Sequence, residues 1–279
     1  MQRCFLLGGR GFIGSRLSDL LTTKGVNWSA PDSNSLNLIP EECVSKLRNL
    51  YKEGDCLIIL AALAPYRGRD VKTFCDNMRI ADNIHKSIDS RISSIVYISS
   101  DAVYEKSQQI VQDDTLPSPS SLYGAMHRSR ELLFRDFSEK LLILRPTMVF
   151  GNADPHDAYG PSKFLRTSLE SGEIVLFGEG EERRDYIGID DIASLIISAI
   201  NRSLRGNFNI ASGTSHSYRA IANMILSKLP NTRLKFLPRR EEVLHRQYPR
   251  PKIWGLLDHQ PVNIACNIEK CFKDFHERI

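Results

Sequence analysis

A tyrosine and a histidine lie one helical turn apart in the segment "SLYGAMHRSRE", which spans residues 121–131. Tyr123 and His127 are four positions apart in a run with helical spacing, so we expect both side chains on one face of a helix. A phenol can exchange a proton with a bound molecule when a neighbouring group tunes its pKa. The pair therefore predicts an acid/base site, and an ordinary pair of residues on a surface helix is the alternative.

Three glycines near the start of the sequence predict a phosphate-binding turn. Gly8, Gly11 and Gly14 in "LLGGRGFIGSRL" follow a short apolar run and open a helical pattern. Glycine is needed where the chain turns sharply and where a pyrophosphate approaches backbone amides at a helix N-terminus. Because the turn leads into a strand–helix–strand pattern, we predict that it binds a dinucleotide. A tight turn without a ligand is the alternative.

Asp32 is the candidate for contact with the adenosine ribose of that dinucleotide. It follows Gly14 by 18 positions, close to the spacing of about 20 at which a carboxylate usually binds the ribose hydroxyls. A carboxylate there favours NAD, because it would repel the 2′-phosphate of NADP. Arg10 and Arg16 could meet that phosphate, which leaves NADP as the alternative cofactor.

Short apolar runs alternate with helical patterns over the first 150 residues. The runs are residues 4–8, 27–30, 56–62, 94–100 and 141–146. Most are apolar throughout, as is typical of strands that are covered on both faces. The helical patterns are residues 15–25, 41–54, 74–88 and 127–139. This alternation predicts right-handed βαβ units and an α/β fold with a doubly wound parallel Rossmann sheet.

The alternation of apolar runs and helical patterns ends after residue 150, where we expect a smaller α+β region. Residues 1–150 are predicted to form the dinucleotide-binding Rossmann domain, to which residues 187–212 return with one more strand at 206–211. Residues 151–279 begin with a loop-like stretch, continue with a helix at 163–171 and end in an irregular Pro- and Arg-rich tail. We predict that they form mainly a substrate-binding cap on the sheet.

The composition excludes several classes of protein. Hydrophobic residues at 42% and charged residues at 25% are ordinary values for a soluble globular protein. The net charge of +4 is too small to indicate a nucleic-acid partner. No apolar run approaches the roughly 18 residues of a membrane span, and the first residues do not resemble a signal peptide. The six cysteines show no metal-ligand spacing, so we expect a cytoplasmic protein without a metal site.

Seven segments in a fixed order carry a family resemblance that covers most of the chain. They are "GGRGFIGS" (8–15), "LAALAP" (60–65), "DNMRIADN" (76–83), "VYISSDAVY" (96–104), "YGAMH" (123–127), "LRPTMVFG" (144–151) and "RRDYIGIDDIA" (183–193). Together they resemble the extended short-chain dehydrogenase/reductase family, in its NAD-dependent epimerase/dehydratase group that acts on nucleotide sugars. The combination is specific for the fold and less specific for the reaction.

The resemblance implies a role for each matching position. Ser100 would hydrogen-bond the substrate oxygen, Tyr123 would be the general acid/base, and Arg184 would lie near the diphosphate of the nucleotide sugar. The positions that would bind the cofactor, Asp32 included, are Gly8, Gly11, Phe12, Ile13, Gly14, Asp32, Ala61, Ala62, Pro146 and Thr147.

His127 stands where the family has a lysine. The fixed charge of that lysine lowers the tyrosine pKa, which is about 10 for a free side chain. A histidine has a reference pKa of about 6.5 and is mostly neutral at pH 7, although its N–H can still reach a ribose hydroxyl. We predict a working but retuned catalytic pair. Unless Arg128 or Arg130 adds a positive charge, Tyr123 should be harder to ionise than in the family.

The residues after Ser100 depart from the pattern of the sugar dehydratases. In that branch an acid and then a glutamate follow the hydroxyl residue, whereas here Asp101 and Ala102 follow. Asp101 is either a catalytic acid or the cap of a turn. Dehydration needs both an acid and a base. Because Ala102 can be neither, one of the two is missing here, which disfavours 4,6-dehydration.

The sequence as a whole predicts an NAD-dependent epimerase of a nucleotide-activated sugar, which acts through a transient keto intermediate. An NAD(P)-dependent keto-sugar reductase is the alternative within the same chemistry. A catalytically weak cofactor-binding scaffold or redox sensor is the alternative from another class. The resemblance also implies a homodimer through residues 74–88 and 123–138, although the Arg and Asp residues in these segments do not favour it.

Overall fold

The structure is a computed structural model that describes residues 2–276 except 153, 156–158, 240, 241, 250, 258 and 259. The chain divides into two compact units. The first unit comprises Met1–Lys106, Asp114–Pro146 and Ile192–Asn209. The second unit comprises Ser107–Asp113, Thr147–Asp191 and Ile210–Ile279. Each unit has its own hydrophobic core.

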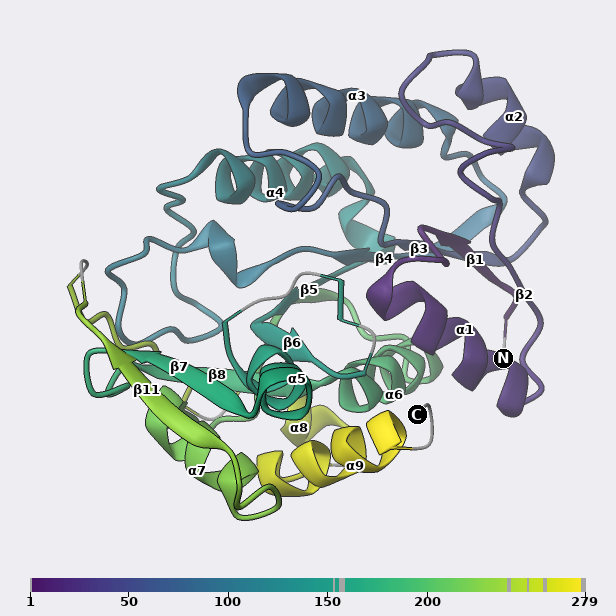
Figure 1. Cartoon of the computed structure of the whole chain (residues 1–279). Helices are drawn as coiled ribbons and strands as arrows, with labels where there is room; N and C mark the ends of the chain where they lie inside the picture. Colours follow the sequence, from purple (N-terminus) through teal and green to yellow (C-terminus); the bar gives the residue numbers. More distant parts are fainter. Residues whose placement is uncertain are drawn as a thin grey trace. The chain divides into compact units, whose positions relative to one another are not determined.

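A six-stranded sheet with the order β2-β1-β3-β4-β5-β9 forms the centre of the first unit (Figure 1). Its strands are β1 (Cys4–Leu7), β2 (Trp28–Ser29), β3 (Asp55–Ile59), β4 (Ile92–Ile98), β5 (Leu141–Pro146) and β9 (Gly206–Ile210). The pairs that join β2, β1, β3, β4 and β5 are all parallel. The predicted α/β fold with a doubly wound parallel sheet is confirmed.

Helices cover both faces of this sheet. They are α1 (Phe12–Thr23), α2 (Cys43–Leu50), α3 (Val71–Ser87), α4 (Leu122–Leu133) and α6 (Ile189–Asn201), together with the 3₁₀ helices η1 (Asp101–Val103) and η2 (Phe134–Lys140). Figure 1 shows α2, α3 and α4 on one face, with α1 and α6 on the other. The strands are therefore covered on both faces, which explains their continuous apolar sequences.

The core on the α2–α4 face comes from alternate strand residues. Phe5, Leu57 and Tyr97 belong to this cluster, as do Leu47 of α2 and Ile84 of α3. Successive side chains of a strand point to opposite faces, so the residues between them face the other helical layer. Tyr97 is therefore directed toward the helices that include α4.

Hydroxyl and carboxylate caps fix the starts of the two helices nearest the predicted catalytic residues. The side chain of Ser121 accepts a hydrogen bond of 3.1 Å from the backbone N–H of Gly124 and begins α4. The Asp70 side chain accepts a bond of 2.8 Å from the N–H of Thr73 and begins α3. Such caps stabilise a helix by about 1 kcal/mol, so the start of α4 is encoded locally.

The second unit contains, in its described residues, two smaller sheets and four helices. The strands are β6 (Met148–Phe150), β7 (Glu173–Phe177), β8 (Arg183–Gly188), β10 (Ser215–Ser217) and β11 (Arg233–Leu237), with the orders β10-β8-β6 and β11-β7. The helices are α5 (Pro161–Ser171), α7 (Tyr218–Leu226), α8 (Ile253–Leu256) and α9 (Ile264–His276). Phe164, Tyr186 and Ile221 belong to its core. The expected smaller α+β region is therefore present.

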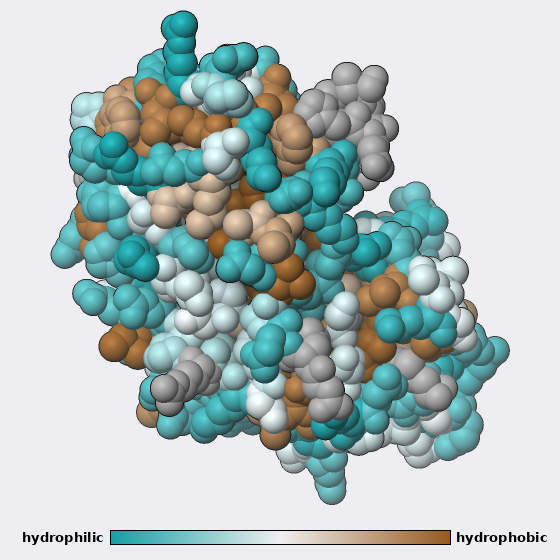
Figure 2. All heavy atoms as spheres, turned by 90° about the horizontal axis from the view of Figure 1, so that it is seen from below, coloured by the Kyte–Doolittle hydropathy of each residue, from teal (hydrophilic) through white to brown (hydrophobic). Residues whose placement is uncertain are grey.

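The surface is mixed in polarity. On the face drawn in Figure 2, hydrophobic residues form several separate groups between hydrophilic ones. Val71, Ile110 and Leu116 are among the large apolar side chains that remain exposed, and such isolated residues are ordinary on a protein surface. No helix in the described part of the chain is long and apolar enough to cross a membrane.

The turn between β1 and α1 is too tight for side chains at Gly8 and Gly14. A Cβ atom on Gly14 would lie 2.2 Å from the carbonyl oxygen of Gly8. Gly8 itself has a φ of +93°, and a Cβ atom there would lie 2.8 Å from the backbone nitrogen of Ala61. A Cβ atom on Gly11, by contrast, would meet only the Gly8 oxygen, at 3.3 Å. Gly8 and Gly14 are thus required by the packing of the turn.

We predict that Gly14→Ala lowers the free energy of unfolding by about 2 kcal/mol or more, because the added methyl group forces the turn apart. Gly11→Ala is the matched control, and its cost should stay below about 1 kcal/mol. Urea denaturation of both variants measures the difference. Equal costs would show that the close approach at Gly14 does not constrain the turn.

Candidate active site

The structure brings Tyr123, His127 and Ser100 together where α4 meets the end of β4. The rings of Tyr123 and His127 lie with their centroids 4.6 Å apart and their planes at 85°. Ser100 follows β4, and its hydroxyl forms a hydrogen bond that lowers the pKa of Tyr123. Tyr123 and His127 therefore share one face of a helix, as their spacing predicted.

The environment of Tyr123 opposes its ionisation. Burial raises the pKa of Tyr123 to about 12, and the negative charge of Asp101 acts in the same direction. The hydrogen bond from Ser100 and the positive charge of Arg130 act against this increase. The phenol is therefore protonated at neutral pH.

His127 is a buried neutral residue rather than a substitute for a charged lysine. Its side chain is 3% exposed, and its Nδ1 shares a hydrogen bond of 2.7 Å with the hydroxyl of Tyr97. Burial lowers the pKa of His127 to about 3, and the charge of Arg130 adds to this effect. Its buried Nε2 has no hydrogen-bond partner among the described residues. Near neutral pH, His127 therefore offers hydrogen bonds but no charge.

Glu131 anchors α4 to the sheet, and the sequence analysis missed its importance. The carboxylate is fully buried and accepts a hydrogen bond of 2.7 Å from the hydroxyl of Ser99. Arg145 of β5 donates to both of its oxygens, at 2.8 Å from Nε and 2.8 Å from Nη2. Two features of the sequence could have pointed to this contact. One is an acidic residue eight positions after Tyr123 in the same helical segment, and the other is an arginine inside an apolar strand.

The network continues beyond Arg145 into a third strand of the first unit. Nη1 of Arg145 donates a hydrogen bond of 2.9 Å to the hydroxyl of Tyr104. That hydroxyl in turn donates one of 2.7 Å to Asn209 of β9. Each nitrogen of the Arg145 guanidinium therefore has an acceptor, which a buried cation needs to be stable.

A small pocket adjoins Tyr123 on the side of α3. Its empty volume is about 230 Å³, and it lies between the loop that precedes α3 and the first turn of α4. Leu63, Asp70, Asn77, Tyr123 and Met126 are among the residues that line it. Apolar and polar side chains both line it, so Tyr123 borders a space of mixed polarity.

The glycine turn fits the pyrophosphate of a dinucleotide. Gly11 caps α1 without a side-chain hydrogen bond, and the first turn of the helix contains no acidic residue. The first backbone N–H groups of α1 are thus not used by a capping side chain, which suits an anion. Phe12 and Ile13 are half-buried at the start of this helix, and the backbone of Ala61 packs against Gly8.

Asp32 lies beside the glycine turn, where a contact with the adenosine ribose requires it. Its Oδ1 accepts a hydrogen bond of 3.0 Å from the backbone N–H of Asn34. Its Oδ2 forms an ion pair of 2.5 Å with Arg10, whose side chain is 73% exposed. A ribose hydroxyl would therefore share this carboxylate with Arg10 or displace it. The preference for NAD over NADP, which was inferred from this carboxylate, remains a prediction.

Pro146 and Thr147 are buried where β5 ends. The Thr147 hydroxyl donates a hydrogen bond of 3.2 Å to the backbone oxygen of Asp185, and its N–H donates one of 3.0 Å to Ile210. These bonds hold the backbone that follows β5 in a defined position. The predicted contact of both residues with the nicotinamide stays a prediction.

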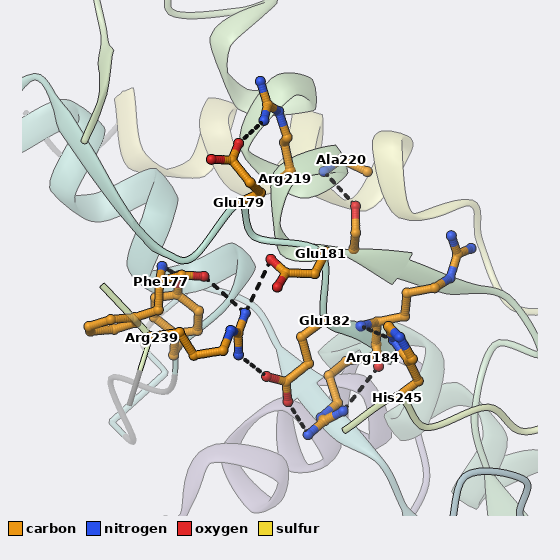
Figure 3. Close-up of polar contacts among 12 residues, drawn as sticks. Phe177, Glu179, Glu181, Glu182, Arg184, Arg219, Ala220, Arg239 and His245 are labelled. Atoms are coloured by element: carbon orange, nitrogen blue, oxygen red, sulfur yellow. Dashed lines mark hydrogen bonds and ion pairs between the residues drawn. The ribbon is translucent and has the colours of Figure 1, made fainter. Parts of the chain in front are cut away.

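Arg184 lies in a network of compensated charges in the second unit (Figure 3). Its guanidinium forms an ion pair with Glu182 and donates to the backbone oxygen of Leu244. Glu182 also accepts a bond of 2.8 Å from Arg239, which donates one of 2.9 Å to the backbone oxygen of Phe177. A diphosphate at Arg184 would have to compete with a carboxylate. The sequence analysis did not identify Glu182 as this competitor.

Comparisons with known proteins identify a family. The family model described as "NAD dependent epimerase/dehydratase family" matches residues 4–211. A UDP-N-acetyl-alpha-D-glucosaminuronate decarboxylase of Bacillus cytotoxicus is 22% identical over 258 residues, which cover 80% of this chain and 79% of the relative.

Two solved structures illustrate how closely the fold is shared. An NAD-dependent NDP-hexosamine 5,6-dehydratase, TunA, matches with a TM-score of 0.83 and 20% identity, and the match covers 99% of this chain and 98% of that one. The UDP-glucose 4-epimerase of Thermus thermophilus, in complex with NAD, matches with a TM-score of 0.80 and 19% identity over 99% and 100% of the two chains. At these identities the likeness establishes the fold, and the names of these proteins span three different reactions.

We predict that Arg145→Met lowers the free energy of unfolding by about 3–5 kcal/mol, because it leaves the Glu131 carboxylate buried without its main partner. Arg128→Met is the matched control. Arg128 pairs with the same carboxylate at 3.2 Å but is 22% exposed, so its loss should cost less than about 1 kcal/mol. Chemical denaturation of both variants tests this difference. Similar costs for the two would contradict the anchoring role of Arg145.

We also predict that His127 makes the fold less stable in acid. The pKa of His127 is about 3 in the folded chain and about 6.5 in the unfolded chain. Between these values the unfolded state binds the additional proton, so stability is lost as the pH falls through this window. The melting temperature of His127→Gln should therefore fall less between pH 7.5 and pH 5 than that of the wild type.

His85→Gln is the control for this pH experiment, because the His85 ring is partly exposed and pairs with Asp136 at 3.0 Å. It should retain the loss of stability that the wild type shows. If His127→Gln loses as much stability in acid as the wild type, then His127 is protonated in the folded protein.

Proposed function

This chain belongs to the NAD-dependent epimerase/dehydratase family, and we propose that it is an epimerase of a nucleotide-activated sugar. The observation that carries the proposal is the position of the Tyr123 phenol next to the Ser100 hydroxyl at the end of β4. A scaffold that only binds NAD has no need for both groups in contact. The glycine turn, with its accessible helix N-terminus, supports NAD as the cofactor.

The proposed mechanism is oxidation of one sugar carbon to a transient ketone, followed by reduction from the opposite face. NAD, when bound, would supply the hydride chemistry that the oxidation and the reduction need. Ser100 hydrogen-bonds the reacting sugar oxygen and holds it toward Tyr123. Once the phenol has released its own proton to solvent, the phenolate of Tyr123 takes the hydroxyl proton during oxidation, and the resulting phenol gives it back during reduction.

Further residues hold the cofactor in this proposal. The amides after Gly11 bind the pyrophosphate, and Asp32 binds the adenosine ribose. His127 contributes its unpartnered Nε2 as a hydrogen-bonding group for the nicotinamide ribose. Arg184 would contact the substrate diphosphate after its ion pair with Glu182 rearranges.

Epimerisation is preferred to dehydration because of the residues that follow Ser100. Asp101 is half-buried at the start of η1, near enough to Tyr123 for its charge to affect the pKa of the phenol. Ala102 cannot act as the second acid or base that removal of water requires. An epimerase needs only the tyrosine as proton donor and acceptor.

A keto-sugar reductase is the second candidate, and the state of Tyr123 favours it. The raised pKa of Tyr123, at about 12, keeps the phenol protonated at neutral pH. A protonated phenol can donate directly to a carbonyl oxygen, whereas an epimerase must first form the phenolate. Reduction of a keto sugar by NADH, without conversion of any ordinary nucleotide sugar, would identify this activity.

We predict that Tyr123→Phe lowers turnover by a factor of about 10² to 10⁴, since it removes the general acid/base. Its affinity for NAD should stay within about twofold of the wild type. The assay incubates the protein with NAD and a panel of UDP-, GDP- and dTDP-sugars, and NMR identifies the epimer. Tyr51→Phe is the control, because it removes a phenol whose hydroxyl bonds Ser87 in the core at 2.7 Å.

Two outcomes contradict the epimerase. Wild-type turnover in Tyr123→Phe would remove the tyrosine from the mechanism. Tight binding of NAD by the wild type, with no conversion of any sugar in either direction, would instead identify a cofactor-binding scaffold.

A further inference from the structure

Arg130 is a fully buried cation on the same helix as the proposed catalytic pair. It lies three positions after His127 and seven after Tyr123, a spacing that places all three on one face of α4. The side chain has no exposed surface. Its Nη2 donates a hydrogen bond of 2.8 Å to the backbone oxygen of Ala61. Its Cζ lies 5.2 Å from the centroid of the Tyr97 ring.

The charge of Arg130 is not balanced by a carboxylate in the part of the chain that the structure describes. Its contacts are the Ala61 carbonyl, the sulfur of Met126 at 3.9 Å and the Tyr97 ring. Its Nε is buried without a hydrogen-bond partner. The neighbouring carboxylate of Glu131 is occupied by Arg145. A desolvated charge without a counter-ion is unfavourable, so its presence calls for a physical explanation.

The alternative cation on this helix, Arg128, is partly exposed and lies next to a carboxylate. Its side chain is 22% exposed, and it pairs with Glu131 at 3.2 Å. Solvent and this carboxylate screen its field at the tyrosine. Arg130 has neither kind of screening, and a guanidinium stays protonated at every pH at which proteins fold.

We propose that Arg130 is a positioning residue that supplies a fixed positive charge on the face of α4 that carries Tyr123, while His127 supplies only hydrogen bonds. The two tasks of the family's single lysine are thereby divided between two side chains of α4. This inference rests on the proposed function, in which Tyr123 transfers the proton.

The division explains why position 127 holds a neutral ring. Arg130 and His127 both contact Tyr97, so a lysine at 127 would place two cations in one buried space. A neutral imidazole avoids this repulsion and keeps a nitrogen available for a ligand. The charge of Arg130 lowers the pKa of His127 as well as that of Tyr123, which agrees with a shared location.

Other charged groups face Tyr123 and limit the effect of Arg130. Asp101 of η1 acts in the opposite direction on the pKa of the phenol. Arg69 and Asp70, from the loop before α3, line the pocket that Tyr123 borders. A test by pH dependence must therefore change Arg130 alone and leave these three residues in place.

A stability cycle between positions 127 and 130 tests the charge without any assay of turnover. We expect His127→Lys to lower the melting temperature by about 4 °C or more in the wild-type background, because it adds a second buried cation. In the Arg130→Met background the same change should cost at most half as much. Additive effects, with the same loss in both backgrounds, would overturn the proposal.

The pH profile of kcat/KM separates a positioning role from a structural one. Removing an opposite charge near an acid raises its pKa, so the profile of Arg130→Met should move to higher pH by about one unit. Arg130→Lys keeps a charge and should stay close to the wild-type profile. If Arg130→Met does not fold, Arg130→Gln is the second neutral variant. If a folded neutral variant keeps the wild-type pH profile of kcat/KM, then Arg130 has a purely structural role and the inference is wrong.

The two experiments also separate this inference from the proposed function. If the wild type converts no nucleotide sugar, the proposed function fails, and the stability cycle still decides whether Arg130 and position 127 share one buried charge site. If the wild type is active and the cycle is additive, the inference fails and the epimerase proposal stands.

Discussion

The buried ion pair between Glu131 and Arg145 is the interaction on which the rest of the site depends. It joins α4 to β5, and the Ser99 hydroxyl ties the same carboxylate to the end of β4. Separating the pair would leave the buried Arg145 guanidinium without a counter-ion and Glu131 with only the partly exposed Arg128, so α4 is held in one register against the sheet. Tyr123 lies two helical turns before Glu131, and this register places its phenol at Ser100.

The same burial that positions the side chains of α4 also controls their protonation. Desolvation is the main reason that Tyr123 keeps its proton and that His127 stays neutral. The side chains of such a site are preorganised, but the Tyr123 phenol resists ionisation. A fixed positive charge within the low-dielectric region is the most direct way to lower the pKa of the phenol. Arg130 is suited to this because its charge is neither titratable nor paired with a described carboxylate.

The fold limits the chemistry without selecting one reaction. Proteins similar to this chain include a decarboxylase, a dehydratase and an epimerase by name, at 19–22% identity. One fold can host several reactions, so the likeness alone does not select among them. In the proposed mechanism the reaction depends on a few side chains at the carboxyl end of β4, where Ser100 and Asp101 are followed by an alanine. In the second unit, the charges around Arg184 compensate one another, so binding of an anion there requires rearrangement.

Local sequence determined the elements of this protein. The apolar runs became the strands of the parallel sheet, Ser121 capped α4, and the four-residue spacing put Tyr123 and His127 on one face, because each of these follows from periodicity or from contacts between neighbours. Only the tertiary structure decided the electrostatics. The pairing of Glu131 with Arg145, the burial of Arg130 under Tyr97 and the neutral state of His127 depend on groups brought together from separate elements. Desolvation and charge–charge interactions act through space, so spacing along the chain does not encode them.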